Sequence, residues 1–158
     1  MTMEISCKIN GVERKLRFEP HERLLHVLRR HGYYEVKDGC SEGHCGVCTV
    51  LVNGKPIKSC LMFAAQAEGK EITTVRGLGT LESPHPIQQA FADEGAVQCG
   101  FCSPAMILCT KYLLDRRPEP SEAEIRRALD GVLCRCTGYT KIFQAVRTAA
   151  ARTKEGER

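Results

Sequence analysis

Apolar and polar residues alternate along the start of the chain, the pattern of half-buried β-strands. The alternation runs over 5–9 and resumes over 15–18, after the dipeptide Asn10-Gly11. Because Asn-Gly favours two-residue hairpin turns, the two runs predict a β-hairpin. Leucines and a valine then recur at helical spacing within 23–30, which predicts a short helix.

A second hairpin is predicted where residues 49–52 lead through Asn53-Gly54 into residues 57–60. A short helix over 61–67 and a last strand over 71–75 follow. These elements predict a small mixed sheet with a helix laid across it.

The second half of the chain has helical periodicity. We expect helices over 85–94, from Pro104 to the prolines near 118, after Ser121, and over 139–151. Ser121-x-x-Glu124 is a capping box, which marks a helix start. Four short helices with short connections indicate a bundle. The fold class is therefore α+β, with a sheet domain over 1–76 and a helical domain over 77–158.

Composition excludes several classes of function. The 158 residues carry 23 basic and 19 acidic side chains, a net charge of +4, with no clustered basic patch of the kind that binds nucleic acid. No apolar run approaches the roughly 18 residues of a membrane helix. The first residues lack the charged and apolar regions of a signal peptide, so we expect a cytoplasmic protein. Its ten cysteines then indicate metal or redox chemistry rather than disulfides.

Three cysteines in the first half have the spacing C-x₄-C-x₂-C, with a fourth downstream, which is the plant-type [2Fe–2S] spacing. Glycines between them allow the unusual backbone angles of a loop that wraps a cluster. Zinc knuckles use separated C-x₂₋₄-C pairs, which fit this single loop poorly. The four candidate ligands are Cys40, Cys45, Cys48 and Cys60.

Four further cysteines form a C-x₂-C pair and a C-x-C pair, each at the end of a predicted helix. Helix N-termini stabilise anionic groups, which suits a cluster. Taken alone, this set could also bind zinc, or its first pair could be a redox dithiol, although the βαβ context of such dithiols is absent. The four are Cys99, Cys102, Cys134 and Cys136.

The remaining chemistry-bearing residues give weaker signals. Cys7 and Cys109 lie in apolar runs and are expected to be small buried hydrophobes. His44 lacks the paired Cys-His loops of a Rieske site and is expected to be exposed. No nucleophile–base pair stands out, so we predict no catalytic residue and no turnover by this chain alone.

Three runs, over 39–49, 98–104 and 133–139, resemble the signature sequences of the small iron–sulfur subunit of molybdenum hydroxylases, the xanthine dehydrogenase, aldehyde oxidoreductase and carbon monoxide dehydrogenase family. The resemblance extends over residues 4–150. It implies a ferredoxin-like β-grasp domain and a four-helix-bundle domain, each holding one [2Fe–2S] cluster on its four cysteines. It also implies that Gln98 and Cys136 contact the pterin of a partner.

The resemblance further implies an oxidoreductase subunit that relays electrons from molybdopterin on a large subunit to FAD on a medium subunit, in a dimer of heterotrimers. A purine or another N-heterocycle is the expected substrate. Alternatives are an aldehyde, carbon monoxide or aromatic acyl-CoA oxidoreductase, or a free-standing ferredoxin. The chain departs from the family pattern at Val47, Ala105 and Val132, and over 31–35.

Overall fold

The alternating runs of the first half form one five-stranded mixed sheet in the computed structural model, which describes residues 1–156. The strand order is β2-β1-β5-β3-β4, with β1 and β5 parallel and the other neighbours antiparallel. The strands are β1 (Met3–Ile9), β2 (Val12–Phe18), β3 (Thr49–Val52), β4 (Lys55–Lys58) and β5 (Glu71–Thr73).

Both predicted hairpins are confirmed. All four turn residues have positive φ, at 51° and 79° in Asn10-Gly11 and at 48° and 74° in Asn53-Gly54. Positive φ at both central positions defines the type I′ turn, whose twist matches that of the flanking strands. The second turn pairs Val52 with Lys55, so β4 begins two residues earlier than predicted and ends before Cys60.

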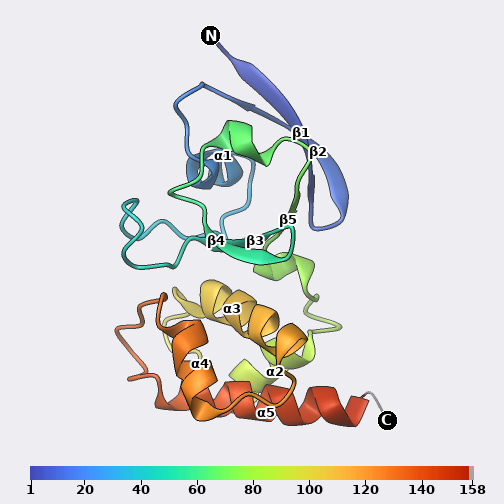
Figure 1. The fold of residues 1–158 in the computed structure, drawn as a ribbon, viewed down its shortest axis with the longest axis vertical. Coiled ribbons are helices and arrows are strands. Elements are labelled where there is room, and N and C mark those ends of the chain that lie inside the picture. The colour runs from blue at the N-terminus through green and yellow to red at the C-terminus, as the bar shows by residue number, and fades with distance from the viewer. Residues whose placement is uncertain (157–158) are drawn as a thin grey trace.

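Helix α1 (Leu24–Arg30) lies across the sheet, as Figure 1 shows. Its leucines are fully buried with the inward residues of β1 and β2. The short helix predicted over 61–67 is only a 3₁₀ turn, η1 (Ala64–Ala67). Ala64 and Ala67 are buried in the same core, and the chain then continues into β5.

The second half folds into four helices around a separate apolar core that includes Phe91, Met106 and Ile125. The last helix continues through Gly156, five residues beyond the predicted end, because no glycine or proline precedes Gly156 in this polar stretch. The helices are α2 (Pro86–Asp93), α3 (Ser103–Arg116), α4 (Glu122–Leu129) and α5 (Thr140–Gly156).

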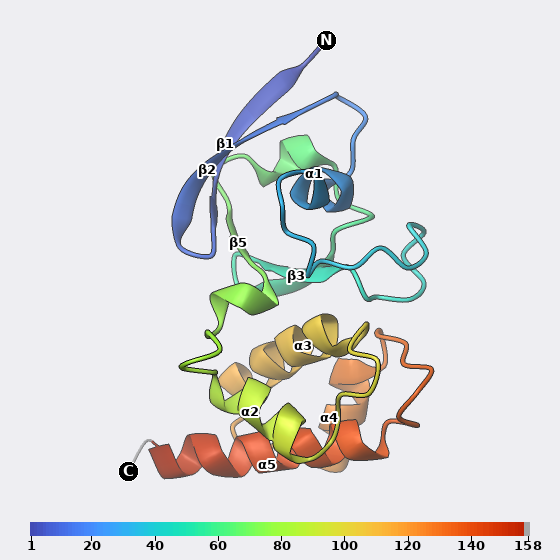
Figure 2. The same ribbon diagram turned by 180° about the vertical axis from the view of Figure 1, so that it is seen from behind.

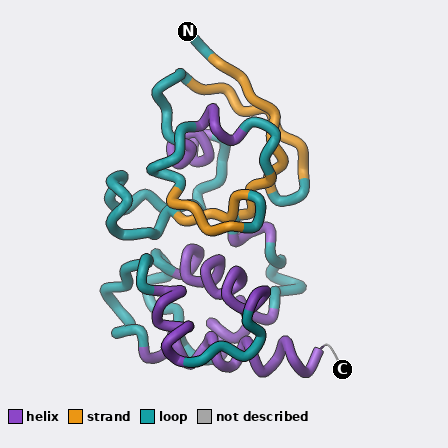
Figure 3. The backbone as a smooth tube through the Cα atoms, in the orientation of Figure 1, coloured by secondary structure: helices purple, strands orange, loops and turns teal. Residues whose placement is uncertain are grey.

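The two halves are stacked, with α3 packed against β3 and β4 (Figure 2). The 3₁₀ turn η2 (Val75–Gly77) leads from the sheet to the helices. The α+β class is thus confirmed, and the loops that carry the cysteines lie on one side of the stack (Figure 3). No helix in residues 1–156 is both long and apolar enough to cross a membrane.

Candidate metal centres

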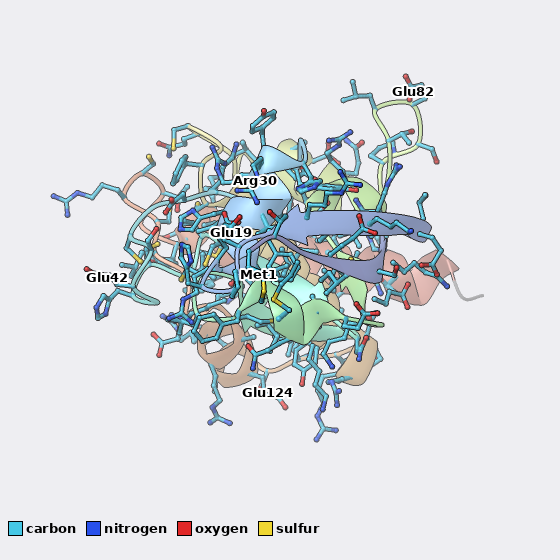
Figure 4. All side chains as sticks on the ribbon, turned by 90° about the horizontal axis from the view of Figure 1, so that it is seen from above. Met1, Glu19, Arg30, Glu42, Glu82 and Glu124 are labelled. Carbon is cyan, nitrogen blue, oxygen red and sulfur yellow. The ribbon has the colours of Figure 1, made fainter. Side chains whose placement is uncertain are left out.

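The first cysteine loop projects from the end of the sheet domain, with Glu42 at the rim of the molecule (Figure 4). The Cys40 Sγ accepts the backbone N–H groups of Glu42 and Cys45, each at 3.4 Å. These donors, Cys45 first, lower the pKa of the Cys40 thiol to about 6. Gly43 has a φ of 81°, which allows the loop to fold its N–H groups inward. The loop is therefore shaped to stabilise negative charge on sulfur.

Cys48 and Cys60 form the buried side of the first set. Their side chains interact with each other, and burial raises the pKa of the Cys60 thiol to about 11. The Ser59 hydroxyl donates to the Cys48 carbonyl oxygen at 2.7 Å and fixes one end of the loop to the other. Because burial disfavours a free thiolate, these two thiols are suited to a bound metal group that takes up the negative charge of each sulfur.

Lys58 is a residue of this site that sequence reasoning missed. Its Nζ donates to the Gly43 carbonyl oxygen at 2.7 Å, so a strand residue braces the projecting loop. Its position two residues before Cys60 is the only sequence signal that could have identified it.

The second set lies where α3 begins and where the chain passes from α4 to α5. Cys102 is the N-cap residue of α3, and burial raises the pKa of its thiol to about 12. The Sγ atoms of Cys99 and Cys136 lie 3.5 Å apart, and both residues are exposed. Backbone N–H from Phe101 is the main cause that lowers the pKa of the Cys99 thiol. This set therefore has one buried edge and one exposed edge.

Tyr139 is a second residue whose structural role was not predicted from the sequence. Its φ is 67°, and its hydroxyl accepts the Cys134 N–H at 2.9 Å and donates to the Val132 carbonyl oxygen at 3.2 Å. The Thr137 Oγ1 lies 3.1 Å from the Cys134 Sγ. These contacts hold the C-x-C loop in a single conformation before α5 begins.

Within each set, the cysteine side chains interact in two pairs. Among residues 1–156, no three His, Cys, Asp or Glu side chains converge on a point that one metal ion could occupy. The paired thiols are Cys40 with Cys45, Cys48 with Cys60, Cys99 with Cys136, and Cys102 with Cys134. A [2Fe–2S] cluster takes four cysteines, two on each iron, so the donor sets fit this group.

The two sets are in direct contact. The Leu133 N–H donates to the Cys45 carbonyl oxygen at 2.8 Å, which links a ligand candidate of the first set to the neighbour of Cys134. Gly46 lies so close that an added Cβ would be 1.8 Å from the Gly131 carbonyl oxygen. A cavity of about 460 Å³ is lined by Cys45 and by all four cysteines of the second set. The structure thus brings the two predicted sites together.

The exposed edge of the second set is surrounded by apolar and polar surface residues. Val97, Phe101 and Leu133 are exposed by 43%, 44% and 56%. Gln98 and Arg135 are exposed beside them. Exposed apolar side chains that lie together are a common feature of surfaces that contact other molecules.

The other candidates lie where they were expected. Cys7 and Cys109 are buried in the apolar cores of the two halves, and burial raises the pKa of each thiol to about 11. His44 is exposed, 3.8 Å from Glu42.

Comparisons with known proteins agree with this geometry. Residues 7–75 match the family described as 2Fe-2S iron-sulfur cluster binding domain, and residues 74–147 match the [2Fe-2S] binding domain. The chain is 50% identical over 149 residues to the nicotinate dehydrogenase small FeS subunit of Eubacterium barkeri, covering 94% of this chain and 95% of that protein. It is 49% identical over 147 residues to the xanthine dehydrogenase iron-sulfur-binding subunit of Escherichia coli O157:H7, covering 92% of each.

A solved structure has the same fold. The chain superposes on quinoline 2-oxidoreductase from Pseudomonas putida 86 with a TM-score of 0.93, at 41% identity and with 99% of each chain covered.

Proposed function

The chain belongs to the family of small iron–sulfur subunits of molybdenum hydroxylases, and on that premise we propose that it relays electrons from a molybdopterin-binding large subunit to an FAD-binding medium subunit. The observation that carries the proposal is the hydrogen bond from the Leu133 N–H to the Cys45 carbonyl oxygen. It joins the two cysteine loops without intervening side chains. Electron transfer between two sites is favoured by their close approach, whereas structural zinc sites have no such requirement.

In this proposal the domain over 1–76 holds one cluster on Cys40, Cys45, Cys48 and Cys60, and the domain over 77–158 holds the other on Cys99, Cys102, Cys134 and Cys136. Each cluster supplies one-electron redox chemistry, with a potential set by hydrogen bonds, charge and exposure. The residues of the chain provide the thiolates, the N–H donors to them and the apolar packing that limits water.

The exposed edge of the second set is the proposed docking point of the large subunit. Gln98 and Cys136 lie on this edge and would contact the pterin, and the apolar side chains around them would be buried by the partner. Burial of exposed apolar surface is the main favourable term in such an association.

Metal content and electron paramagnetic resonance (EPR) test the relay. We expect about four irons per chain and two distinct signals after reduction. Replacing Cys134 by Ser should remove one signal and keep the other. Zinc in either site, or iron for only one cluster, would overturn the proposal.

The contact with the pterin has its own test. In the assembled enzyme, Gln98→Ala should slow reduction of the clusters by substrate but not by dithionite. Gln89→Ala is the matched control, because Gln89 is an exposed glutamine on α2 outside this edge. Equal slowing of reduction in both variants would exclude a specific role for Gln98.

An N-heterocycle is the proposed substrate of the complex. Support comes from the names of the relatives above, since nicotinate, xanthine and quinoline all contain a ring nitrogen. We propose that the complex is a cytoplasmic dimer of heterotrimers, which light scattering of the purified enzyme would test. Turnover assays with these heterocycles against aldehydes would decide the substrate class.

A further inference from the structure

Besides the packing of α3 against β3 and β4, the two halves of the protein are linked at two places. One is the contact between Cys45 and Leu133 beside the cysteines. The other is the linker that begins at Thr74. Glu42, on the first cysteine loop, and Glu82, in the linker region, lie on different sides of the molecule in Figure 4. In Figures 1 and 2 the first cysteine loop and the turn η2, which directly follows Thr74, also lie on different sides of the stack, so the two places are apart from each other.

Thr74 uses all its polar groups at the second place. Its N–H donates to the Asn10 Oδ1 at 2.8 Å, and its hydroxyl accepts from the Asn10 Nδ2 at 3.0 Å. The same hydroxyl donates to the Glu35 Oε1 at 2.7 Å. Thr74 is only 1% exposed and the Glu35 side chain 11% exposed. The start of the linker is thus fixed to both the first hairpin turn and the loop after α1.

The connection continues into the helical half. A Cβ on Gly77 would lie 2.3 Å from the Asn10 side-chain oxygen, so the linker passes directly against this residue. The Gln88 Nε2 of α2 donates to the Val75 carbonyl oxygen at 3.1 Å. The turn η2 is therefore linked to the sheet on one side and to the helices on the other.

We propose that Asn10, Glu35 and Thr74 form a positioning clamp that fixes the distance between the two cysteine sites. It acts together with the packing of α3 against β3 and β4, and it fixes the end of the interface that lies away from the contact between Cys45 and Leu133. Glu35 lies in the stretch over 31–35 that departs from the family pattern, so the clamp gives that stretch a role. The inference rests on the proposed function, because it requires a cluster at each site.

A pair of variants at Thr74 tests the clamp in the assembled enzyme. Thr74→Val keeps the shape and removes the hydroxyl, whereas Thr74→Ser keeps the hydroxyl. The readout is the dipolar coupling between the reduced clusters in EPR, measured as splitting or as relaxation enhancement, since this coupling falls steeply with distance. We expect Thr74→Val to weaken or lose the coupling with both cluster signals retained, and Thr74→Ser to keep the coupling of the parent protein.

Glu35→Ala provides a second route if Thr74→Val fails to fold. Its matched control is Glu4→Ala, which removes a carboxylate paired with Arg17 on the sheet, away from the linker. Parent-like coupling in both Thr74→Val and Glu35→Ala overturns the clamp, as does equal weakening in Glu4→Ala. Iron content separates this failure from that of the relay, because a chain with fewer than two clusters refutes the proposed function itself.

Discussion

Gly46 is the position where a single methyl group tests the contact between the two cysteine sites. Its φ is 69°, and an added Cβ would lie 1.8 Å from the Gly131 carbonyl oxygen and 3.1 Å from the Val132 Cα. Real Cβ contacts stay beyond 3.0 Å, so the loops would have to separate by over an ångström. Gly46→Ala should therefore break the neighbouring hydrogen bond between Leu133 and Cys45, which is 2.8 Å long.

The expected magnitude has two parts. A side chain in the left-handed region costs about 1–2 kcal/mol. Loss of one backbone hydrogen bond costs about 1 kcal/mol more. We therefore expect Gly46→Ala to lower the free energy of unfolding by about 2–3 kcal/mol, at the upper end of the usual range for single substitutions. It should also weaken the dipolar coupling between the clusters.

Gly11→Ala is the matched control. Gly11 has a φ of 79° in the first hairpin turn, and no atom lies within 4 Å of an added Cβ. In this control, backbone strain should lower the free energy of unfolding by only about 1–2 kcal/mol, and the coupling between the clusters should stay unchanged. Both free energies come from urea unfolding followed by circular dichroism at pH 7. Equal losses in the two variants would refute the close approach of the loops.

Three further predictions concern other parts of the chain. Cys109→Ala should keep about four irons per chain, whereas Cys102→Ala should lose iron, as elemental analysis would report. Ser121→Ala should lower the free energy of unfolding by about 1 kcal/mol in thermal or urea unfolding, because it removes the N-cap of α4. Glu22 has its pKa lowered to about 2, chiefly by the Arg30 guanidinium at 2.8 Å. The ionised Glu22 side chain contributes fully to the free energy of unfolding above pH 4.5, and this contribution is lost as pH falls through 2. In urea unfolding, the difference in free energy of unfolding between the parent protein and Glu22→Gln should therefore become smaller on acidification.

The features that could be predicted from the sequence are those fixed by neighbouring residues. Asn10-Gly11 determines its turn because both positions tolerate positive φ. The capping box at Ser121 fixes the start of α4, where the Ser121 and Glu124 side chains each accept a backbone N–H of the other residue. Cysteine spacing works in the same way, since a loop of given length can bring its thiols only to certain positions.

The features that could not be predicted depend on contacts between distant segments. Val47 lies between Cys45 and Cys48 of the first set but packs into the helical core. Lys58 and Tyr139 brace the loops through hydrogen bonds to backbone atoms, which any sequence could supply. The end of α5 was placed too early because no proline or cap marks it before Gly156. Such contacts depend on how the two halves pack against each other, which the local sequence pattern does not predict.

In the proposed relay, the distribution of exposure would determine which site each partner reaches first. In the second set, Cys99 and Cys136 face solvent, while Cys102 is buried. Cys134 is partly buried and follows Leu133, whose N–H donates to the Cys45 carbonyl oxygen in the first loop. A partner docked on the exposed edge would thus reach the second cluster before the first. The first loop, with its exposed Glu42 and His44, remains free on the other side of that contact for a different partner. Substitutions around Val97 should therefore impair entry of electrons, and substitutions around Glu42 should impair their exit.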